Sequence, residues 1–305
     1  MFASVFFLAA MQLSIPFGKP RQIEQPRAPI EKAGPRWAAT CTENDDWDKP
    51  GPPVRIHGNA YYVGTCGISA ILITGTGGHI LIDGTTEKGA GVVAANIAAL
   101  GFKLSDVRTI LTSHEHFDHV GGIAELQQRS RASLVTSLPA SRVFTTGLPA
   151  KDDPQAGMHK AFPSASVERV IRDGEQVRLG NLMVEAIATP GHSPGAMSWR
   201  WISCDGGVCR TIVYADSLTP VSRDDYRFSD HPEYLQAYRA SIAKIAASPC
   251  DILLSPHPSA SGLRDRFARG ERLLDPDGCT AYAAEVGKAL DERLAKEAAQ
   301  AKPRR

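Results

Sequence analysis

Three short apolar runs in this chain each end a few residues before a histidine. The runs are Val107–Leu111, Leu182–Ile187 and Ile252–Leu254, and the histidines that follow them are His114, His192 and His257. Runs of this length, rich in Val, Ile and Leu, indicate buried strands. The residues just beyond a strand lie at an edge of its sheet, so this pattern predicts a sheet protein whose chemistry concentrates at strand ends.

The first run leads into a dense cluster of metal-binding side chains. Side chains alternate faces in an extended segment, so His114, His116 and Asp118 are expected to project to one side. His119 joins them where the chain turns toward a helix. Imidazole and carboxylate suit zinc, iron or manganese. The pair His114–Glu115 does not begin an H-E-x-x-H zinc helix, because Asp118 stands where that motif needs its second histidine.

His192 and His257 complete a set of six candidate ligands. A single histidine in a loop is more often a surface group than a ligand, but both follow strands in the same way as the cluster. Six ligands are enough for two ions with three protein ligands each and open positions for water. The histidines without such company are expected to be structural or exposed: His57, His79, His159 and His231.

The rest of the chain mixes strand and helix patterns. Further strands are expected at residues 55–57, 61–63, 68–74, 79–82, 134–136, 196–202 and 211–214. Helices are expected around residues 92–100, from residue 123, and at 232–247 and 281–299. Because no long linker follows residue 40, these elements favour one α/β domain with layered sheets, assigned to residues 36–305.

The first 35 residues are expected to lie outside this domain. Met1–Ile15 is apolar and uncharged, too short to span a bilayer but long enough for the apolar region of a signal peptide. No Lys or Arg precedes it, and a buried N-terminal segment is the alternative. Gly18–Pro35 is Pro-rich and polar, like an unstructured lead-in. The leader favours export, with a periplasmic location and no membrane attachment of the mature protein.

Composition excludes some partners. The 305 residues include 34 basic and 33 acidic side chains, a formal net charge of +1, whereas nucleic-acid binders usually carry a strong positive excess. Hydrophobic residues make up 43% and charged residues 22%, which is typical of a globular chain. A nucleic-acid partner is therefore not expected. The partner is expected to be a small-molecule substrate, and the protein is expected to be a monomer.

The six cysteines are expected to form disulfides. Cys204 and Cys209 flank a Gly-containing turn between two strand patterns, so a hairpin would bring their sulfur atoms together. Pairing of neighbours then suggests Cys41 with Cys66 and Cys250 with Cys279. The connectivity does not follow from sequence, since six cysteines permit about 15 pairings, and six buried thiols are the alternative.

A competing motif overlaps His192. The stretch Gly191–Gly195 fits the G-x-S-x-G pattern of serine hydrolases, in which the backbone N–H after the serine helps to form the oxyanion hole. Here Pro194 follows Ser193 and has no N–H. Ser193 is therefore expected to shape the loop that aims His192, and not to act as a nucleophile.

With these residues in place, the sequence resembles the metallo-β-lactamase superfamily over roughly residues 40–290. The finer resemblance is to subclass B3, in particular to the Adelaide imipenemase group. It is carried by four segments: residues 62–70, 113–119, 214–219 and 256–263. The resemblance implies a four-layer αβ/βα sandwich with the metals in a groove between sheet edges. The three proposed disulfides also resemble those of that group.

The resemblance implies two zinc sites. The first zinc ion would take His114, His116 and His192, and the second Asp118, His119 and His257. Ser217 stands where another subclass has a cysteine ligand, and a hydroxyl is a poor zinc ligand. Ser217 and Thr219 become candidates for binding the substrate carboxylate or a metal-bound water. Gln155 matches a substrate-facing glutamine of the same group.

Asp216 leaves the substrate open. In glyoxalase II-like and lactonase-like members of the superfamily, an aspartate near this point bridges the two metals, so the metal motif alone does not choose a substrate. A secreted hydrolase of a lactone or thioester is the alternative, and a metal-binding protein without catalysis is a third. The leader and the proposed disulfides favour a compartment outside the cytosol, unlike that of glyoxalase II.

The implied activity is zinc-dependent opening of the β-lactam ring of penicillins, cephalosporins and carbapenems, which gives antibiotic resistance. Zinc brings the pKa of bound water from about 15.7 to about 7, so hydroxide is available at neutral pH. Asp118 would hold the hydroxide, with His114 and His116 on the zinc ion that polarises the carbonyl. The second zinc ion would stabilise charge on the departing nitrogen. No acyl-enzyme is needed, so clavulanate-type inhibitors should fail.

Overall fold

The computed structural model describes residues 33–269 and 273–300. The first half of the chain contains α1 (Ala33–Thr40), β1 (Val54–His57), β2 (Ala60–Tyr62), β3 (Ile71–Gly75), β4 (Gly78–Ile82), α2 (Gly89–Ala99), η2 (Leu104–Asp106), β5 (Val107–Leu111), α3 (Phe117–Val120), α4 (Ile123–Ser130), β6 (Ser133–Thr136) and α5 (Leu138–Thr146). The second half contains β7 (Val167–Val170), β8 (Gln176–Leu179), β9 (Leu182–Ala188), β10 (Met197–Asp205), β11 (Val208–Tyr214), η3 (Phe228–Asp230), α6 (Pro232–Ala246), β12 (Ile252–Leu254), η4 (Pro258–Ser261), α7 (Leu263–Ala268) and α8 (Gly278–Gln300).

Two sheets form the centre of the molecule. One has seven strands in the order β1-β2-β3-β4-β5-β6-β7, and the other has five in the order β12-β11-β10-β9-β8. Neighbouring strands from β1 through β4 pair antiparallel, whereas neighbouring strands from β4 through β7 pair in parallel. In the second sheet only β11 and β12 are parallel. Both sheets are therefore mixed.

Strand periodicity explains why helices cover both sheets. In β3 the side chains of Ile71 and Ile73 enter the core between the sheets, while Leu72 enters a second core under the helices. In β11, Tyr214 faces the core between the sheets and Val213 faces a third core. Because successive strand residues point to opposite faces, a strand that is apolar on both faces needs cover on both.

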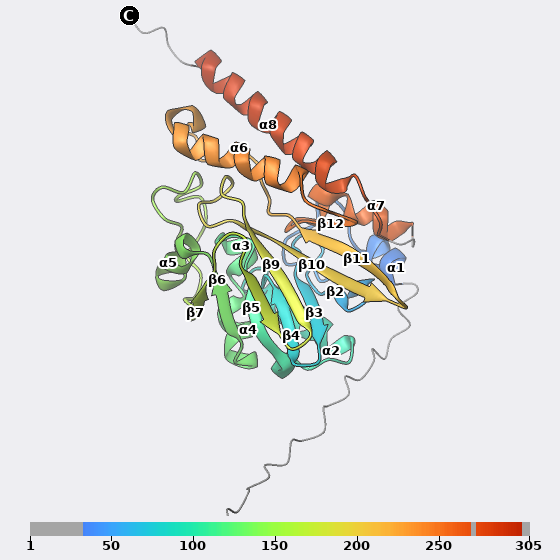
Figure 1. Cartoon of the computed structure of the whole chain (residues 1–305). Coiled ribbons are helices and arrows are strands. Elements are labelled where there is room, and N and C mark those ends of the chain that lie inside the picture. Colours follow the sequence, from blue (N-terminus) through green and yellow to red (C-terminus); the bar gives the residue numbers. More distant parts are fainter. Residues whose placement is uncertain (1–32, 270–272, 301–305) are drawn as a thin grey trace, which may run out of the picture.

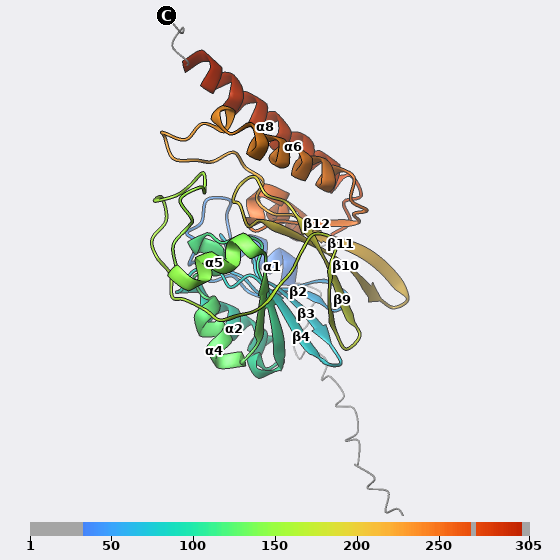
Figure 2. The ribbon, with the colours of Figure 1, turned by 60° about the vertical axis from the view of Figure 1, so that its left-hand side comes forward.

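Helices supply that cover and complete four layers. Residues of α2, α4 and α5 join the core on the outer face of the seven-stranded sheet. Residues of α6 and α8 join the core on the outer face of the five-stranded sheet. Figures 1 and 2 show α6 and α8 side by side over that sheet, with α2, α4 and α5 on the opposite side of the molecule. The predicted αβ/βα sandwich is confirmed.

The start of the fold differs from the sequence prediction. Residues 1–32 of the expected leader lie outside the described residues, but Ala33–Pro35 belong to α1 and not to a lead-in. Gly34 lies so close to α7 that an added Cβ would be 2.9 Å from the Phe267 carbonyl oxygen. Trp37, 1% exposed, anchors the helix in the core between the sheets. Pro35 is tolerated because the first turn of a helix needs no N–H donor.

The expected strand at residues 68–74 begins later, at Ile71. Ile68 closes a turn with Thr65, in which the Thr65 N–H donates to the Ile68 carbonyl at 2.9 Å. The Ser69 N–H donates to the carbonyl of Pro256 at 2.8 Å. These groups are used by the turn and by the His257 loop, so they are not available to the sheet.

Three disulfides join segments of the described chain. They pair Cys41 with Cys66, Cys204 with Cys209 and Cys250 with Cys279. Cys204 and Cys209 lie opposite each other on the β10–β11 hairpin. Within residues 33–269 and 273–300, no helix is both long and apolar enough to cross a membrane.

Candidate metal centre

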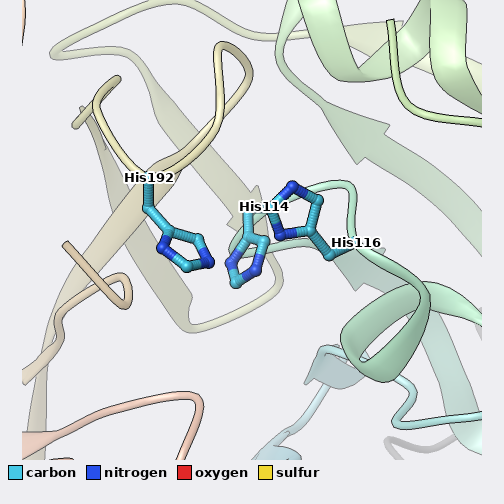
Figure 3. Close-up of side chains that lie close together, drawn as sticks. All are labelled: His114, His116 and His192. Carbon is cyan, nitrogen blue, oxygen red and sulfur yellow. The ribbon is translucent and has the colours of Figure 1, made fainter. Parts of the chain in front are cut away.

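The candidate ligands meet where strands of both sheets end. His114 and His116 follow β5 of the seven-stranded sheet, while His192 lies in the loop between β9 and β10 and His257 follows β12. Figure 3 shows His114 and His116 on one segment and His192 on another, with their rings converging on a common space. One potential ligand atom from each of these three residues lies within 4.8 Å of the other two.

A second group adjoins the first. His114, Asp118 and His119 also offer ligand atoms within 4.8 Å of one another. His257 completes this side, with its Nε2 atom 3.3 Å from Asp118 Oδ2 and its ring centroid 4.9 Å from that of His119. The six side chains proposed from sequence therefore lie together.

The expected extended geometry of the cluster ends at His116. Asp118 and His119 lie in α3, a single helical turn, so they do not continue the alternation of His114 and His116. The turn still directs both side chains into the site: His119 Nε2 lies 3.0 Å from Asp118 Oδ2. Convergence thus comes from a strand end followed at once by a helix, not from one extended segment.

The donor set fits metal ions. His114 Nε2 and His119 Nδ1 are buried and have no hydrogen-bond partner among the described residues. Buried polar atoms without partners are costly, and a bound cation would satisfy them. Imidazole nitrogens with one carboxylate form a donor set that suits zinc and related transition metals. The fold and these groups identify a metal site.

Electrostatics keep key ligands in the forms that bind metal. Burial, together with neighbouring imidazoles, holds the pKa values of His114 and His192 well below the ordinary histidine value. Burial would raise the pKa of Asp118, but His119 and His257 outweigh it and hold that pKa well below its usual range. Metals bind neutral imidazole and ionised carboxylate, so these shifts favour binding at neutral pH.

Polar groups behind the histidines leave one ring nitrogen facing the site. Nδ1 of His114 lies 2.7 Å from Asp216 Oδ1, and Nε2 of His116 lies 3.0 Å from Asp153 Oδ2. Nδ1 of His192 lies 2.9 Å from the carbonyl oxygen of Thr219 and 3.0 Å from its hydroxyl. Such partners fix the tautomer and the orientation of a ligand. Metal would therefore meet Nε2 of His114 and His192 and Nδ1 of His116.

Three buried acidic residues of this framework were given no role from sequence. Asp153 supports His116, and Glu115 contacts the His192 loop. Asp83, 0% exposed, accepts hydrogen bonds from the backbone and hydroxyl of Ser113 at 2.6 and 2.7 Å and from Tyr214 at 2.7 Å. Their partners are distant in the sequence, so no local spacing indicates them.

The loop between α5 and β7 covers one side of the site. Gln155 Nε2 lies 3.1 Å from His192 Nε2, and Gln155 Oε1 lies 3.2 Å from His159 Nε2. The His159 ring stacks on that of His116 with centroids 4.6 Å apart. His159, which was expected from the sequence to be structural or exposed, therefore lies against the cluster. Its position four residues after Gln155, in the same loop, was the available signal.

The hydroxyl groups proposed for substrate binding differ in their surroundings. Ser217 is 3% exposed, and its Oγ has no partner among the described residues. The Thr219 hydroxyl contacts His192 Nδ1. Ser217 thus retains a free polar atom, whereas Thr219 holds a ligand in place.

The serine-hydrolase alternative finds no matching geometry. Ser193 donates its hydroxyl to Glu115 Oε2 at 2.8 Å, so Ser193 is not paired with a histidine base. Pro194 contributes no N–H to an oxyanion hole. These contacts place Ser193 in the support of the loop.

The His257 side is the accessible side of the site. The His257 side chain is 30% exposed, compared with 0% for His119. Trp47, 42% exposed, lies beside it, with its ring centroid 6.3 Å from that of His257. His257 and Trp47 are therefore accessible beside the otherwise buried ligands.

Comparison with known proteins agrees with this architecture. Residues 63–257 match the family model described as metallo-beta-lactamase superfamily. The chain belongs to the metallo-β-lactamase superfamily. The matched segment begins just after β2 and ends at His257, so it contains all six candidate ligands.

Solved structures give the similarity in more detail. The chain is 52% identical to the MIM-2 metallo-beta-lactamase, covering 90% of this chain and 100% of that one with a TM-score of 0.84. It is 43% identical to MEM-A1, a subclass B3 metallo-beta-lactamase from a soil metagenome library, covering 84% and 100% with a TM-score of 0.81. The resemblance to subclass B3 is confirmed.

Curated relatives in this superfamily are more distant. A hydroxyacylglutathione hydrolase of Bradyrhizobium sp. (strain ORS 278) is 30% identical over 200 residues, 65% of this chain and 64% of that protein. The match therefore spans less than two thirds of the length of that relative.

Proposed function

We propose that this metallo-β-lactamase homologue hydrolyses the amide bond of penicillins, cephalosporins and carbapenems with two zinc ions. The full-length similarity to solved metallo-β-lactamases carries the proposal. The convergence of six ligand side chains into two adjoining groups supports the number of ions. Export to the periplasm, function as a monomer and a role in antibiotic resistance belong to the same proposal.

The residues divide between the two ions by position. His114, His116 and His192 would hold the first zinc ion. Asp118, His119 and His257 would hold the second. Zinc ions held there would supply Lewis acidity, which would make water a stronger nucleophile at neutral pH and would polarise the carbonyl of the substrate.

The protein's own groups arrange the reactants. The Asp118 carboxylate stays ionised at neutral pH and can accept a hydrogen bond from the attacking water, which orients it toward the carbonyl. Ser217 Oγ is free to donate to the carboxylate that β-lactams carry. His159 lies over the His116 ring, and Gln155 contacts both His159 and His192. The Asp216 and Thr219 contacts keep His114 and His192 in fixed orientations.

Hydrolysis of a thioester is the second candidate, favoured by the similarity to hydroxyacylglutathione hydrolase. The position of Asp216 argues against it. In other members of the superfamily an aspartate near this point bridges two metals, but Asp216 Oδ1 lies 2.7 Å from His114 Nδ1, on the far side of the ring from Nε2. Asp216 is also fully buried. Its carboxylate thus supports a ligand from behind.

A direct assay separates the two substrates. Zinc-loaded protein is expected to hydrolyse nitrocefin, to lose this activity with a chelator and to regain it with added zinc. Clavulanate should cause no time-dependent inactivation, because Ser193 is engaged with Glu115 and is not activated. Inactivity toward nitrocefin in zinc-loaded protein that cleaves a hydroxyacylglutathione thioester would reject the proposal in favour of the second candidate.

A further inference from the structure

Two sequence features that the proposed function does not use are joined in the structure. Glu115 belongs to the rejected H-E-x-x-H pattern, and Ser193 belongs to the rejected G-x-S-x-G pattern. Glu115 is 1% exposed, and its Oε2 accepts the Ser193 hydroxyl at 2.8 Å. Its Oε1 accepts the N–H of Gly195 at 2.9 Å. Both oxygens of this buried carboxylate are therefore used.

These hydrogen bonds connect two ligand-bearing segments. Glu115 lies between His114 and His116, which follow a strand of the seven-stranded sheet. Ser193 and Gly195 flank the end of the loop that carries His192, between two strands of the five-stranded sheet. The partners lie 78 and 80 residues apart in the chain. One side chain thus links the parts of the three-histidine group that come from different sheets.

Gly195 is fitted closely to this contact. A Cβ atom there would lie 2.6 Å from Glu115 Oε2 and 2.7 Å from the backbone nitrogen of Ala140, so only glycine permits the approach. The carbonyl of Gly195 accepts the Ser137 hydroxyl at 2.7 Å. Both the N–H and the carbonyl of Gly195, three positions after His192, are therefore hydrogen-bonded to side chains.

We propose that Glu115 is a positioning residue that sets the place of His192 relative to His114 and His116, and thereby the zinc affinity of that group. The inference rests on the proposed function for the identity of the metal. Glu115 does not itself act as a ligand, because its two oxygens face Ser193 and Gly195. Loss of groups that orient ligands typically costs 10–100-fold in metal affinity.

Two substitutions distinguish hydrogen bonding from other effects. In Glu115→Gln the amide oxygen can accept from Gly195 and the amide nitrogen can donate to the Ser193 hydroxyl, which is also an acceptor. In Glu115→Leu both hydrogen bonds are lost with little change in volume. We expect E115Q to bind zinc within about threefold of the unmodified protein and E115L to bind about 10–100-fold more weakly.

Competition with a chromophoric chelator, on metal-free and fully oxidised protein, measures each zinc-binding step without any substrate. In E115L the zinc affinity should fall at one of the two zinc-binding steps. S193A removes one of the two hydrogen bonds with a smaller change in packing than E115L. Its zinc affinity is expected to fall several-fold, so S193A tests the inference even if E115L folds poorly. Glu297→Leu is the matched control: Glu297 is 2% exposed and accepts two backbone N–H groups at 3.0 and 2.9 Å, away from the ligands. E297L should reduce stability and leave both zinc constants unchanged.

Unchanged zinc affinity in E115L and S193A would overturn the inference, and so would an equal loss in E115Q and E115L. Either result leaves the proposed function intact if the unmodified protein hydrolyses nitrocefin. Conversely, zinc binding that depends on Glu115 in a protein inactive toward nitrocefin would reject the proposed function and support the inference.

Discussion

At the scale of single residues, the two nitrogens of each imidazole have different roles in the site. A buried acceptor holds one nitrogen of His114, His116 and His192, and the other faces the shared space. Asp153 has a further effect on His116. Burial lowers the pKa of His116, but the hydrogen bond and the charge of Asp153 outweigh burial, so the pKa lies above its ordinary value.

The histidines of the metal-free protein should titrate in a defined order. As the pH falls through about 6.5, the ordinary histidine value, His116 should be protonated while His114 and His192 stay neutral. Asp153→Asn removes the charge that raises the pKa of His116, so burial should dominate and the pKa should fall. Ring chemical shifts in NMR titrations measure both effects. An identical His116 titration in D153N would contradict this account.

The side chains that meet at the candidate metal site could be predicted from sequence, whereas those that support them could not. His192 and His257 follow apolar strands in the way that His114 does, and this local pattern was sufficient. Asp83, Asp153 and Glu115 are defined by contacts across long stretches of chain, and no local pattern indicates which residues they contact. Only the folded arrangement identifies them.

At the scale of elements, two loops interlock beside the site. Arg223, after β11, donates from Nη1 to the carbonyl of Asp153 at 2.9 Å, and its N–H donates to the carbonyl of Pro154 at 3.0 Å. The loop that carries Asp153 and Gln155 is thus fixed to the loop that follows Thr219. One of the contacts that hold this loop is thus made by a side chain that can be removed by substitution.

Arg223→Ala should loosen this loop. We expect the KM for nitrocefin to rise several-fold with a smaller change in kcat, because Gln155 would lose its fixed position. The unfolding free energy should fall by about 1 kcal/mol, the typical net value of a hydrogen bond. Steady-state kinetics and urea unfolding check this, with the exposed Arg142→Ala as the control. An unchanged KM would show that Arg223 does not order the loop.

Helices and strands with strong apolar patterns could be predicted from the sequence, whereas those without such a pattern could not. The strand at Val107–Leu111 is found with the expected bounds. The edge strand β7, Val167–Val170, was missed because three of its four residues are exposed and it lacks the alternation of a half-buried strand. Helix α5 was missed because Pro139 stands in it, although proline fits the first turn of a helix and Ser137 caps this one.

At the scale of the whole molecule, disulfides secure the outer layer on the second sheet. The bridge between Cys250 and Cys279 joins the segment before β12 to the start of α8 across 29 residues, whereas Cys204–Cys209 closes only 5. In the chain-entropy relation, longer closed loops give more stabilisation, about 3.5 kcal/mol for the first bridge and about 2 kcal/mol for the second.

Removal of each bridge tests that difference. The double substitution C250A/C279A should lower the free energy of unfolding by about 1.5 kcal/mol more than C204A/C209A. Urea unfolding of oxidised protein at one fixed zinc concentration provides the comparison. A larger loss from the hairpin bridge would contradict the argument.

The central claim, that side chains from both sheets form one centre for two cations, can be tested by anomalous diffraction at the zinc edge from crystals of zinc-loaded protein. The account predicts two peaks, one between His114, His116 and His192 and the other between Asp118, His119 and His257. A single peak elsewhere, or no peak at these side chains, would contradict it.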